Sequence, residues 1–297
     1  MFEGLSVALV TPFKDGALDE AAIERLVDFV IGGGTDVLVV AGSTGEAVTL
    51  TREERRRLYQ AVQRANQGRA RLVAGTGTNV TRDSIELTAE ARALGYDGAM
   101  LVVPYYNKPT PAGQVAHFSA IAQAVDLPLI LYNVPGRTGT NMTPETVARL
   151  AEVPNIVALK EASGSLDQVS AIRARTDLTI LSGDDSLTLP MLAIGARGVV
   201  SVVGNVAPRP MKNLLEAFSE GRLVDAERLH RQLTPIMRAL FLESNPGPAK
   251  SLLADMGLMA NELRLPLVPV EASTARAVRE AARVAGIVLK DTVGAAR

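Results

Sequence analysis

The sequence predicts an α/β protein, built as a (β/α)8 barrel with a C-terminal helical extension. Eight short apolar runs alternate with longer amphipathic segments over about the first 220 residues. Each run is continuous rather than alternating in polarity, which is typical of parallel strands buried on both faces. From about residue 222 onward the chain contains only segments with helical spacing. An open, doubly wound sheet is the alternative, but eight evenly repeated units favour a closed barrel.

The predicted strands lie in eight apolar runs. They are LSVALVTPF (5–13), VLVVAGST (37–44), RLVAGTG (71–77), AMLVVPYY (99–106), PLILYNVP (128–135), IVALKEAS (156–163), LTILSGDD (178–185) and GVVSVVGN (198–205).

The segments between these runs carry the start and stop signals of helices. Two of them start at Asp19 and Thr51 and end at glycine, and Thr51 with Glu54 has the spacing of a capping box. We therefore expect a barrel domain over 1–221 that holds the functional site. A helical domain over 222–297 should follow, with VDAERLHRQLTPIMRALFLE, PAKSLLADMG and EASTARAVREAARVAG as its helices.

The composition excludes several classes of function. Of 297 residues, 31 are basic and 32 acidic, so the basic excess of a nucleic-acid-binding protein is missing. The absence of cysteine excludes disulfides, thiolate metal sites and cysteine nucleophiles. The N-terminus lacks the basic segment of a signal peptide, and no apolar run reaches the ~18 residues of a membrane span. We expect a soluble, cytoplasmic protein.

Lys160 directly follows the apolar residues 156–159 of the run IVALKEAS, at the end of the predicted core strand, and is the first candidate for chemistry. The carboxyl ends of the strands form the active-site face of such barrels. Of the six lysines, Lys160 alone follows a core strand. Desolvation in a barrel mouth favours the neutral amine, which can attack a carbonyl substrate. The alternative is that Lys160 pairs with a carboxylate and only closes the core, and the spacing leaves both interpretations open.

Tyr132 ends the preceding strand, so its side chain can meet Lys160 at the barrel mouth. A phenol there can shuttle protons while an imine forms. The alternative is a tyrosine that packs its ring and points its hydroxyl at water. Two neighbouring strands that end in tyrosine and lysine favour the catalytic interpretation.

The segment GSTGE (42–46) follows the second strand and precedes a helix. Its glycines let backbone N–H groups converge, and Ser43 and Thr44 add hydroxyls, so it suits a small carboxylate. It lacks the GK[ST] of a nucleotide-binding loop. GTGTNV (75–80) has Val80 where a dinucleotide fingerprint needs its third glycine, so we expect no dinucleotide site.

Arg137 lies a few residues beyond the fifth strand and can bind a second carboxylate, since arginine binds carboxylates through two parallel hydrogen bonds. A solvated loop arginine is the alternative. A metal centre is not expected, because no histidine lies near Asp184 and Asp185 and because His117 and His230 fall on predicted helices.

Six motifs occur in an order and spacing that resemble the dihydrodipicolinate synthase family over residues 4–287. They are GSTGE, PYYNKP, LYNVPGRTG, LKEASG, SGDD and FLESNPGPAK. The resemblance implies a pyruvate-dependent class I aldolase without metal or organic cofactor. Such an enzyme condenses pyruvate with aspartate semialdehyde in lysine and diaminopimelate biosynthesis.

The resemblance also implies a role for each candidate residue. Lys160 would form a Schiff base with pyruvate and Tyr132 would shuttle protons. Thr44 would relay protons between Tyr132 and Tyr106, and a neighbouring subunit of a tetramer, a dimer of dimers, would supply Tyr106. The residues implied to bind substrate are Ser43 and Thr44 at the pyruvate carboxylate, Arg137 at the semialdehyde carboxylate, and Gly183 with the Val200 carbonyl in the pocket wall.

Lysine inhibits some members of the family at an allosteric site. The matching positions here are Ala47, Arg52, Arg55, Asn79, Asp83 and Tyr105. Ala47 removes a hydrogen-bond partner that sensitive members often have, while Arg52 and Arg55 add positive charge. We therefore expect weak or absent inhibition, unless both arginines turn outward to solvent and leave the site usable.

Two alternatives to this function are considered. Sister aldolases, N-acetylneuraminate lyase and the 2-keto-3-deoxy sugar acid aldolases, share the lysine and tyrosine, but they tend to lack an arginine at position 137. A non-catalytic sensor of keto acids is disfavoured because Lys160, Tyr132, Thr44 and Tyr106 are all present.

Overall fold

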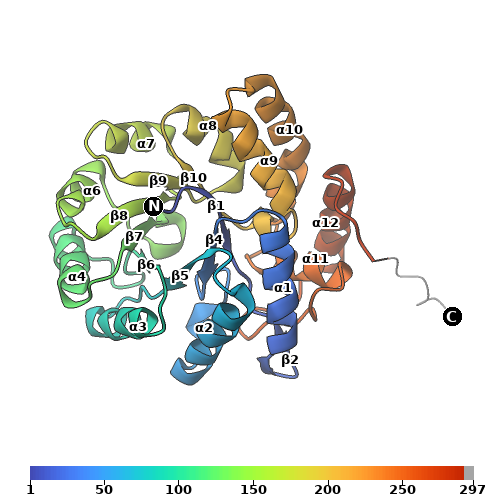
Figure 1. The fold of residues 1–297 in the computed structure, drawn as a ribbon, viewed down its shortest axis with the longest axis horizontal. Coiled ribbons are helices and arrows are strands. Elements are labelled where there is room, and N and C mark those ends of the chain that lie inside the picture. Colours follow the sequence, from blue (N-terminus) through green and yellow to red (C-terminus); the bar gives the residue numbers. More distant parts are fainter. Residues whose placement is uncertain (291–297) are drawn as a thin grey trace.

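The computed structural model describes residues 1–290 and contains a closed barrel of parallel strands in the order β1-β10-β9-β8-β7-β6-β5-β4 (Figure 1). The strands are β1 (Gly4–Ala8), β4 (Val37–Val40), β5 (Arg71–Gly75), β6 (Gly98–Val102), β7 (Leu129–Asn133), β8 (Ile156–Glu161), β9 (Thr179–Ser182) and β10 (Gly198–Ser201). The predicted barrel is confirmed.

Helices follow the strands and form the outer ring of the barrel (Figure 1). They are α1 (Glu20–Gly32), α2 (Arg52–Asn66), α3 (Thr81–Ala93), α4 (Pro111–Ala124), α6 (Pro144–Ala151), α7 (Leu166–Arg173), α8 (Thr188–Ala193) and α9 (Pro208–Ser219). Shorter elements lie in the loops: a β2–β3 hairpin (Phe13–Lys14, Ala17–Leu18), α5 (Pro135–Thr138), η1 (Ala47–Thr49), η2 (Asp185–Leu187) and η3 (Val203–Asn205).

The predicted helix starts are confirmed in detail. The Asp19 side chain accepts a hydrogen bond from the Ala22 backbone N–H at the start of α1. Thr51 and Glu54 form the reciprocal capping box of α2. Each cap satisfies N–H groups of a first helical turn, which have no partner within the helix.

The strands end earlier than the apolar runs do. The run 37–44 forms a strand only to Val40, because Ala41 has φ +56°, a left-handed conformation that no strand accommodates. The run 5–13 ends as a strand at Ala8, and its last residue belongs to the β2–β3 hairpin. The residues beyond the strands form the loops at the mouth of the barrel.

Alternation along the strands determines which side chains fill the barrel. Ile130 and Tyr132 of β7 and Ala158 of β8 belong to the interior cluster, while Leu159 packs against the outer helices. Because side chains two residues apart share a face, Lys160 points to the same side as Ala158. The interior is apolar up to the level of Tyr132 and Lys160, and there it becomes polar.

The C-terminal extension consists of α10 (Leu223–Ala239), α11 (Gly247–Asp255) and α12 (Ala272–Val284), close to the three predicted helices. The helices α11 and α12 lie on one side of the barrel, beyond α1 (Figure 1). Their side chains share one hydrophobic cluster with α1, α9 and β1, including Leu252 and Val278. The extension therefore packs on the barrel core.

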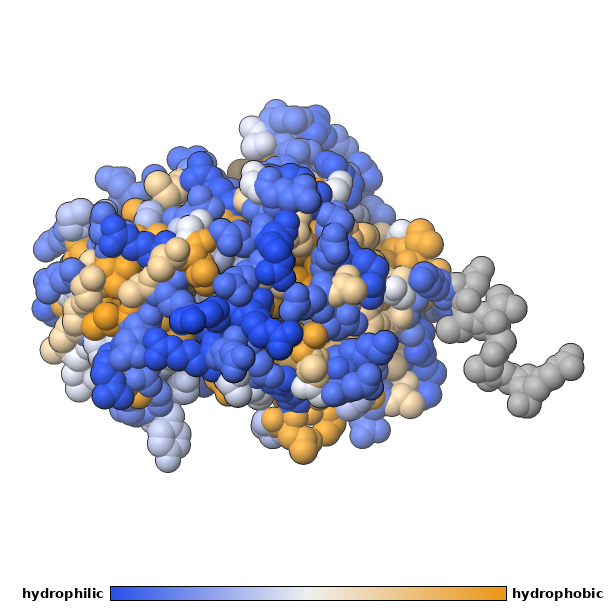
Figure 2. All heavy atoms as spheres, turned by 60° about the horizontal axis from the view of Figure 1, so that its bottom comes forward, coloured by the Kyte–Doolittle hydropathy of each residue, from blue (hydrophilic) through white to orange (hydrophobic). Residues whose placement is uncertain are grey.

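The surface in Figure 2 is mostly hydrophilic, with separate apolar patches. Among residues 1–290, no helix is long and apolar enough to cross a membrane.

Candidate active site

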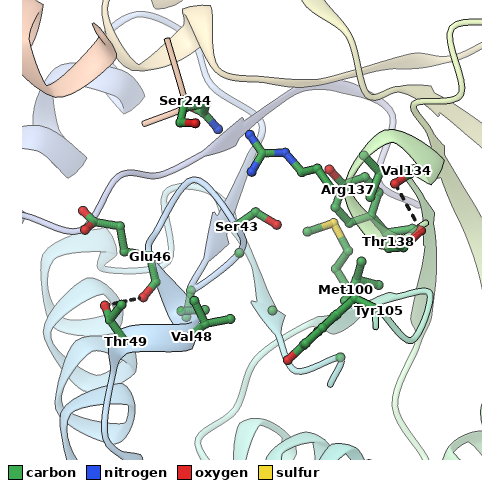
Figure 3. A pocket seen from close by; sticks show the side chains of 18 of the residues that line it. Ser43, Glu46, Val48, Thr49, Met100, Tyr105, Val134, Arg137, Thr138 and Ser244 are labelled. Carbon is green, nitrogen blue, oxygen red and sulfur yellow. Dashed lines mark hydrogen bonds between the residues drawn. The ribbon is translucent and has the colours of Figure 1, made fainter. Parts of the chain in front are cut away.

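A cavity of about 340 Å³ opens at the carboxyl ends of the strands (Figure 3). Loop residues after β4, β5, β6 and β7 line most of it, and the extension adds Ser244, Asn245, Pro266 and Leu267. Of the predicted catalytic and substrate-binding residues, Ser43, Tyr132 and Arg137 line this cavity.

Lys160 and Tyr132 lie side by side near the carboxyl ends of β8 and β7, and of the two only Tyr132 lines the cavity. They are register partners on the adjacent strands β8 and β7. The Lys160 amine nitrogen Nζ is 4.0 Å from the centroid of the Tyr132 ring, and both residues are buried. The prediction that the Tyr132 and Lys160 side chains meet is therefore confirmed.

Lys160 differs from the second buried lysine in its partners. Lys250 on α11 is fully buried, and its Nζ is 2.6 Å from a carboxylate oxygen of Glu46. For Lys160, no carboxylate oxygen of residues 1–290 lies within 4.0 Å of Nζ. The ion pair considered as the alternative role of Lys160 is thus not formed within the described chain.

The GSTGE loop makes a tight turn between two residues with left-handed backbones, Ala41 at φ +56° and Glu46 at φ +52°. Ser43 is exposed and lines the cavity, whereas Thr44 is only 4% exposed. Within residues 1–290, the backbone N–H groups of Ser43 and Thr44 have no backbone acceptor. These groups are thus free to bind an anion, which fits the predicted carboxylate site.

Glu46 fixes the end of this loop to the extension. Its carboxylate accepts hydrogen bonds from Lys250 Nζ and from the Arg264 backbone N–H. Burial lowers the pKa of Lys250, and the charge of Glu46 partly offsets this. Left-handed backbone in a residue other than glycine persists where its surroundings hold it, and these contacts hold Glu46.

Arg137 extends its guanidinium toward Ser244, above Ser43 (Figure 3). It belongs to α5, immediately after β7. Within the described chain, its guanidinium forms no ion pair or hydrogen bond with another residue. An unpaired arginine at the rim of a cavity is suited to an anionic ligand.

Two carboxyl groups, the partly buried Asp184 and the buried Asp185, feel the charge of Lys160 without forming an ion pair with it. Burial raises the pKa of both Asp184 and Asp185. The charge of Lys160 partly offsets this for Asp184. For Asp185 the offset comes first from hydrogen bonds with Ser201 and two backbone N–H groups, and least from Lys160. Asp185 accepts hydrogen bonds from the Ser201 hydroxyl and two backbone N–H groups, so its role is structural. The described residues contain no cluster of three or more histidine, cysteine or acidic side chains that could hold a metal.

Glu161 is the last residue of β8 and directly follows Lys160. Its carboxylate accepts hydrogen bonds from the side chains of Asn133 and Gln168 and from the Ser163 backbone N–H. Burial raises the pKa of Glu161 above its usual value, and these hydrogen bonds offset only part of that rise. The network ties β7 to β8 at the level of Tyr132 and Lys160.

Five of the predicted catalytic and substrate-binding residues lie outside the cavity lining: Thr44, Lys160, Tyr106, Gly183 and Val200. Tyr106 is 90% exposed, and its neighbour Tyr105 lines the cavity instead. Val200 is buried on β10 opposite Ser6, and the Gly183 N–H donates to the Glu161 carbonyl. A side chain at Gly183 would collide with Ala162, so this position requires glycine. These roles stay predictions.

Five of the six candidate allosteric positions are divided between two hollows. Ala47 and Tyr105 line the main cavity, whereas Arg52, Arg55 and Asp83 line a separate groove between α2 and α3. Asn79 lines neither of the two, and its carbonyl accepts a hydrogen bond from the Asn107 side chain.

The two arginines point in different directions. Arg52 turns outward to Glu86, as the alternative interpretation required. Arg55 does not, because it is 9% exposed and donates to the backbone carbonyls of Ala47 and Gly75. Its positive charge therefore stays at the inner end of the groove.

Sequence reasoning assigned no role to the lining residues from the extension or to the buried pair of Glu46 and Lys250. Ser244, Asn245 and Lys250 belong to the motif FLESNPGPAK, which is one of the six motifs of the family resemblance and could have drawn attention to them. These residues lie some 200 positions from the GSTGE loop in the chain, and only the fold shows that they meet it.

A (β/α)8 barrel with a buried, unpaired lysine beside a tyrosine at its mouth defines a lyase of the class I aldolase type. The model of the Dihydrodipicolinate synthetase family matches residues 1–285, and the chain belongs to this family.

Relatives and solved structures agree with this assignment. A 4-hydroxy-tetrahydrodipicolinate synthase of Pelobacter propionicus is 53% identical over 272 residues, 91% of this chain and 94% of that protein. The chloride-inhibited dihydrodipicolinate synthase from Acinetobacter baumannii, complexed with pyruvate, is 42% identical with a TM-score of 0.95, covering 97% of this chain and 100% of that one. The enzyme from Cyanidioschyzon merolae with lysine bound is 45% identical with a TM-score of 0.94, covering 97% and 99%.

Proposed function

We propose that this chain condenses pyruvate with L-aspartate 4-semialdehyde and so has 4-hydroxy-tetrahydrodipicolinate synthase activity, a step of lysine and diaminopimelate biosynthesis. The observation that carries the proposal is the buried, unpaired Lys160 beside Tyr132 in a chain of this family. One structural relative holds pyruvate, which supports pyruvate as the first substrate.

In the proposed mechanism, the Lys160 amine attacks the keto carbon of pyruvate and the carbonyl oxygen leaves as water, which gives a Schiff base. Tyr132 supplies and removes the protons of these steps, with Thr44 and the Tyr106 of a neighbouring subunit as the relay. Ser43 and the free N–H groups of the loop hold the pyruvate carboxylate. Loss of a methyl proton then gives an enamine, whose carbon attacks the aldehyde carbon while the aldehyde oxygen takes up a proton. The amino group of the second substrate then attacks the imine carbon, which closes the ring and releases the Lys160 amine.

The proposal is tested by measuring turnover of pyruvate plus aspartate semialdehyde in an assay coupled to the next reductive step. Cleavage of N-acetylneuraminate and of 2-keto-3-deoxygluconate is measured in parallel. We expect the first activity to dominate. A higher rate of cleavage of either sugar acid would assign the chain to a sister activity instead.

Arg137→Ala should raise the KM for aspartate semialdehyde more than the KM for pyruvate. The unpaired guanidinium lies at the cavity rim, and loss of a charge-assisted hydrogen bond costs ~1.5–3 kcal/mol, or about 10- to 150-fold in affinity. Steady-state kinetics with each substrate varied in turn measure the two constants. An equal rise in both would contradict the assignment of Arg137 to the second substrate.

We propose a homo-oligomer, a tetramer built as two tight dimers, in which Tyr106 completes a neighbour's site. Three exposed apolar side chains support an interface at this end of the barrel: Val48, Val80 and Tyr106, in the loops after the neighbouring strands β4, β5 and β6. Tyr106→Phe should lower kcat without changing the unfolding temperature. A fully active monomer in sedimentation at assay concentration would contradict the shared site.

Inhibition by lysine should be weak or absent. Arg55 holds a permanent charge at the inner end of the groove, bound to carbonyls, and lysine would bring two ammonium groups. Like charges ~4–6 Å apart cost a few kcal/mol at an effective dielectric of ~20, or about 100-fold in affinity. A lysine titration of the initial rate measures this.

The matched variant for this titration is Arg55→His, which removes the permanent charge. We expect half-inhibition of the unchanged enzyme to lie well above about a millimolar, and Arg55→His to become more sensitive. Inhibition of the unchanged enzyme below a millimolar would refute the prediction.

A further inference from the structure

Asn245 of the C-terminal extension contacts the proposed catalytic threonine directly. It lies just before α11 and reaches the GSTGE loop, 201 residues away in the chain. Its side-chain nitrogen Nδ2 donates a hydrogen bond of 2.9 Å to Thr44 Oγ1, and both residues are buried. Among the described residues, this is the one hydrogen bond of the Thr44 side chain.

The other polar atom of the Asn245 amide has no partner in the part of the chain that the structure describes. Its oxygen Oδ1 is buried and has no hydrogen-bond partner among residues 1–290, and Asn245 lines the cavity. Buried polar atoms without a partner are rare in folded proteins. The observed hydrogen bond to Thr44 is therefore the contact that determines which way the Asn245 amide faces.

We propose that Asn245 is a positioning residue that sets the direction of the Thr44 hydroxyl proton. An amide NH2 group donates and does not accept, so the Thr44 O–H cannot point at it. The hydroxyl proton is then left to point away from Asn245. The inference rests on the proposed function, since the hydroxyl is the proposed link of the proton relay.

The surroundings hold both partners of this hydrogen bond rigidly. Glu46, two residues after Thr44, pairs with Lys250, five residues after Asn245. The same segment of the extension thus contacts the loop twice, at Thr44 and at Glu46. A donor that is fixed before the reaction begins needs no reorganisation when charge develops, which is the condition for efficient proton relay.

A double-mutant cycle with Thr44→Val tests the inference. Asn245→Leu keeps the approximate shape and removes the donor, so kcat should fall about 10-fold while the KM for pyruvate changes less than about threefold. Asn245→Asp is closer in shape but accepts the Thr44 proton and draws it away, so kcat should fall further, by about 100-fold. In the Thr44→Val background, Asn245→Leu should leave kcat unchanged, because no hydroxyl remains to be oriented.

The outcomes separate this role from a merely structural one. Equal losses from Asn245→Leu in both backgrounds, or wild-type kcat in Asn245→Asp, would overturn the inference. Asn66→Asp is the matched control, since Asn66 is equally buried, donates to the Ala70 carbonyl and lies at the opposite end of the barrel. Asn66→Asp should change the unfolding temperature and leave kcat per folded protomer unchanged.

The proposed function is tested separately in the same experiment. If the wild-type enzyme did not turn over the two substrates, the proposed function would fail. The rate at which borohydride traps pyruvate on Lys160 would then be compared across the same variants, because imine formation needs the same proton relay. If Asn245→Leu did not fold, as judged by circular dichroism, Asn245→Asp in both backgrounds would decide the question.

Discussion

Lys160→Ala should abolish the trapping of pyruvate by borohydride and lower turnover by ~10³-fold or more, as expected when a covalent nucleophile is lost. In the wild-type enzyme, borohydride should reduce the imine to a stable amine and add one pyruvate-derived mass to the peptide that holds Lys160. The reason is geometric. The Nζ of Lys160 lies 4.0 Å from the Tyr132 ring centroid and has no carboxylate partner within residues 1–290.

Lys212→Ala is the matched control for this experiment. Lys212 pairs with Asp36 at the far end of the barrel, 2.8 Å away, and should lose neither trapping nor turnover. Mass spectrometry of the reduced, digested protein locates the modification. If Lys160→Ala still trapped pyruvate at full yield, another amine would form the imine and the assignment would be wrong.

The fold was predictable because each unit of the barrel carries its own local signals. Buried strands appear as continuous apolar runs, and the caps at Asp19 and Thr51 mark helix starts that the structure confirms. The strand ends were placed too late, since a run such as 37–44 gives no sign that Ala41 takes a left-handed backbone. That conformation depends on the packing of the loop rather than on the residue type.

The site was predictable where it depends on a strand end. Tyr132 and Lys160 fall on adjacent strands, so the strand order alone brings them together. The contacts of Asn245 with Thr44 and of Lys250 with Glu46 depend on how the extension packs on the barrel, which local patterns do not encode. For the same reason, the opposite orientations of Arg52 and Arg55, three residues apart on one helix, could not be predicted from the sequence.

Lys250→Met should destabilise the protein by ~3–5 kcal/mol, because it leaves the Glu46 carboxylate buried without a counter-ion. Both side chains of the pair are fully buried, and the Lys250 amine also lies 4.5 Å from the centroid of the Phe13 ring. Urea unfolding at a fixed protomer concentration measures the loss. Lys212→Met makes the same substitution in a partly exposed pair and should cost at most about 1 kcal/mol.

The double variant Glu46→Gln/Lys250→Met shows whether the charge itself is responsible. Methionine fills much of the lysine volume, and a neutral amide at position 46 can still accept the hydrogen bond from the Arg264 backbone N–H. The double variant should therefore be more stable than Lys250→Met alone, since a buried pair replaced by neutral groups costs less than a buried charge left unpaired. If the double variant were as unstable as the single one, the loss would come from packing around α11, and the pair would not be what holds the GSTGE loop against the extension.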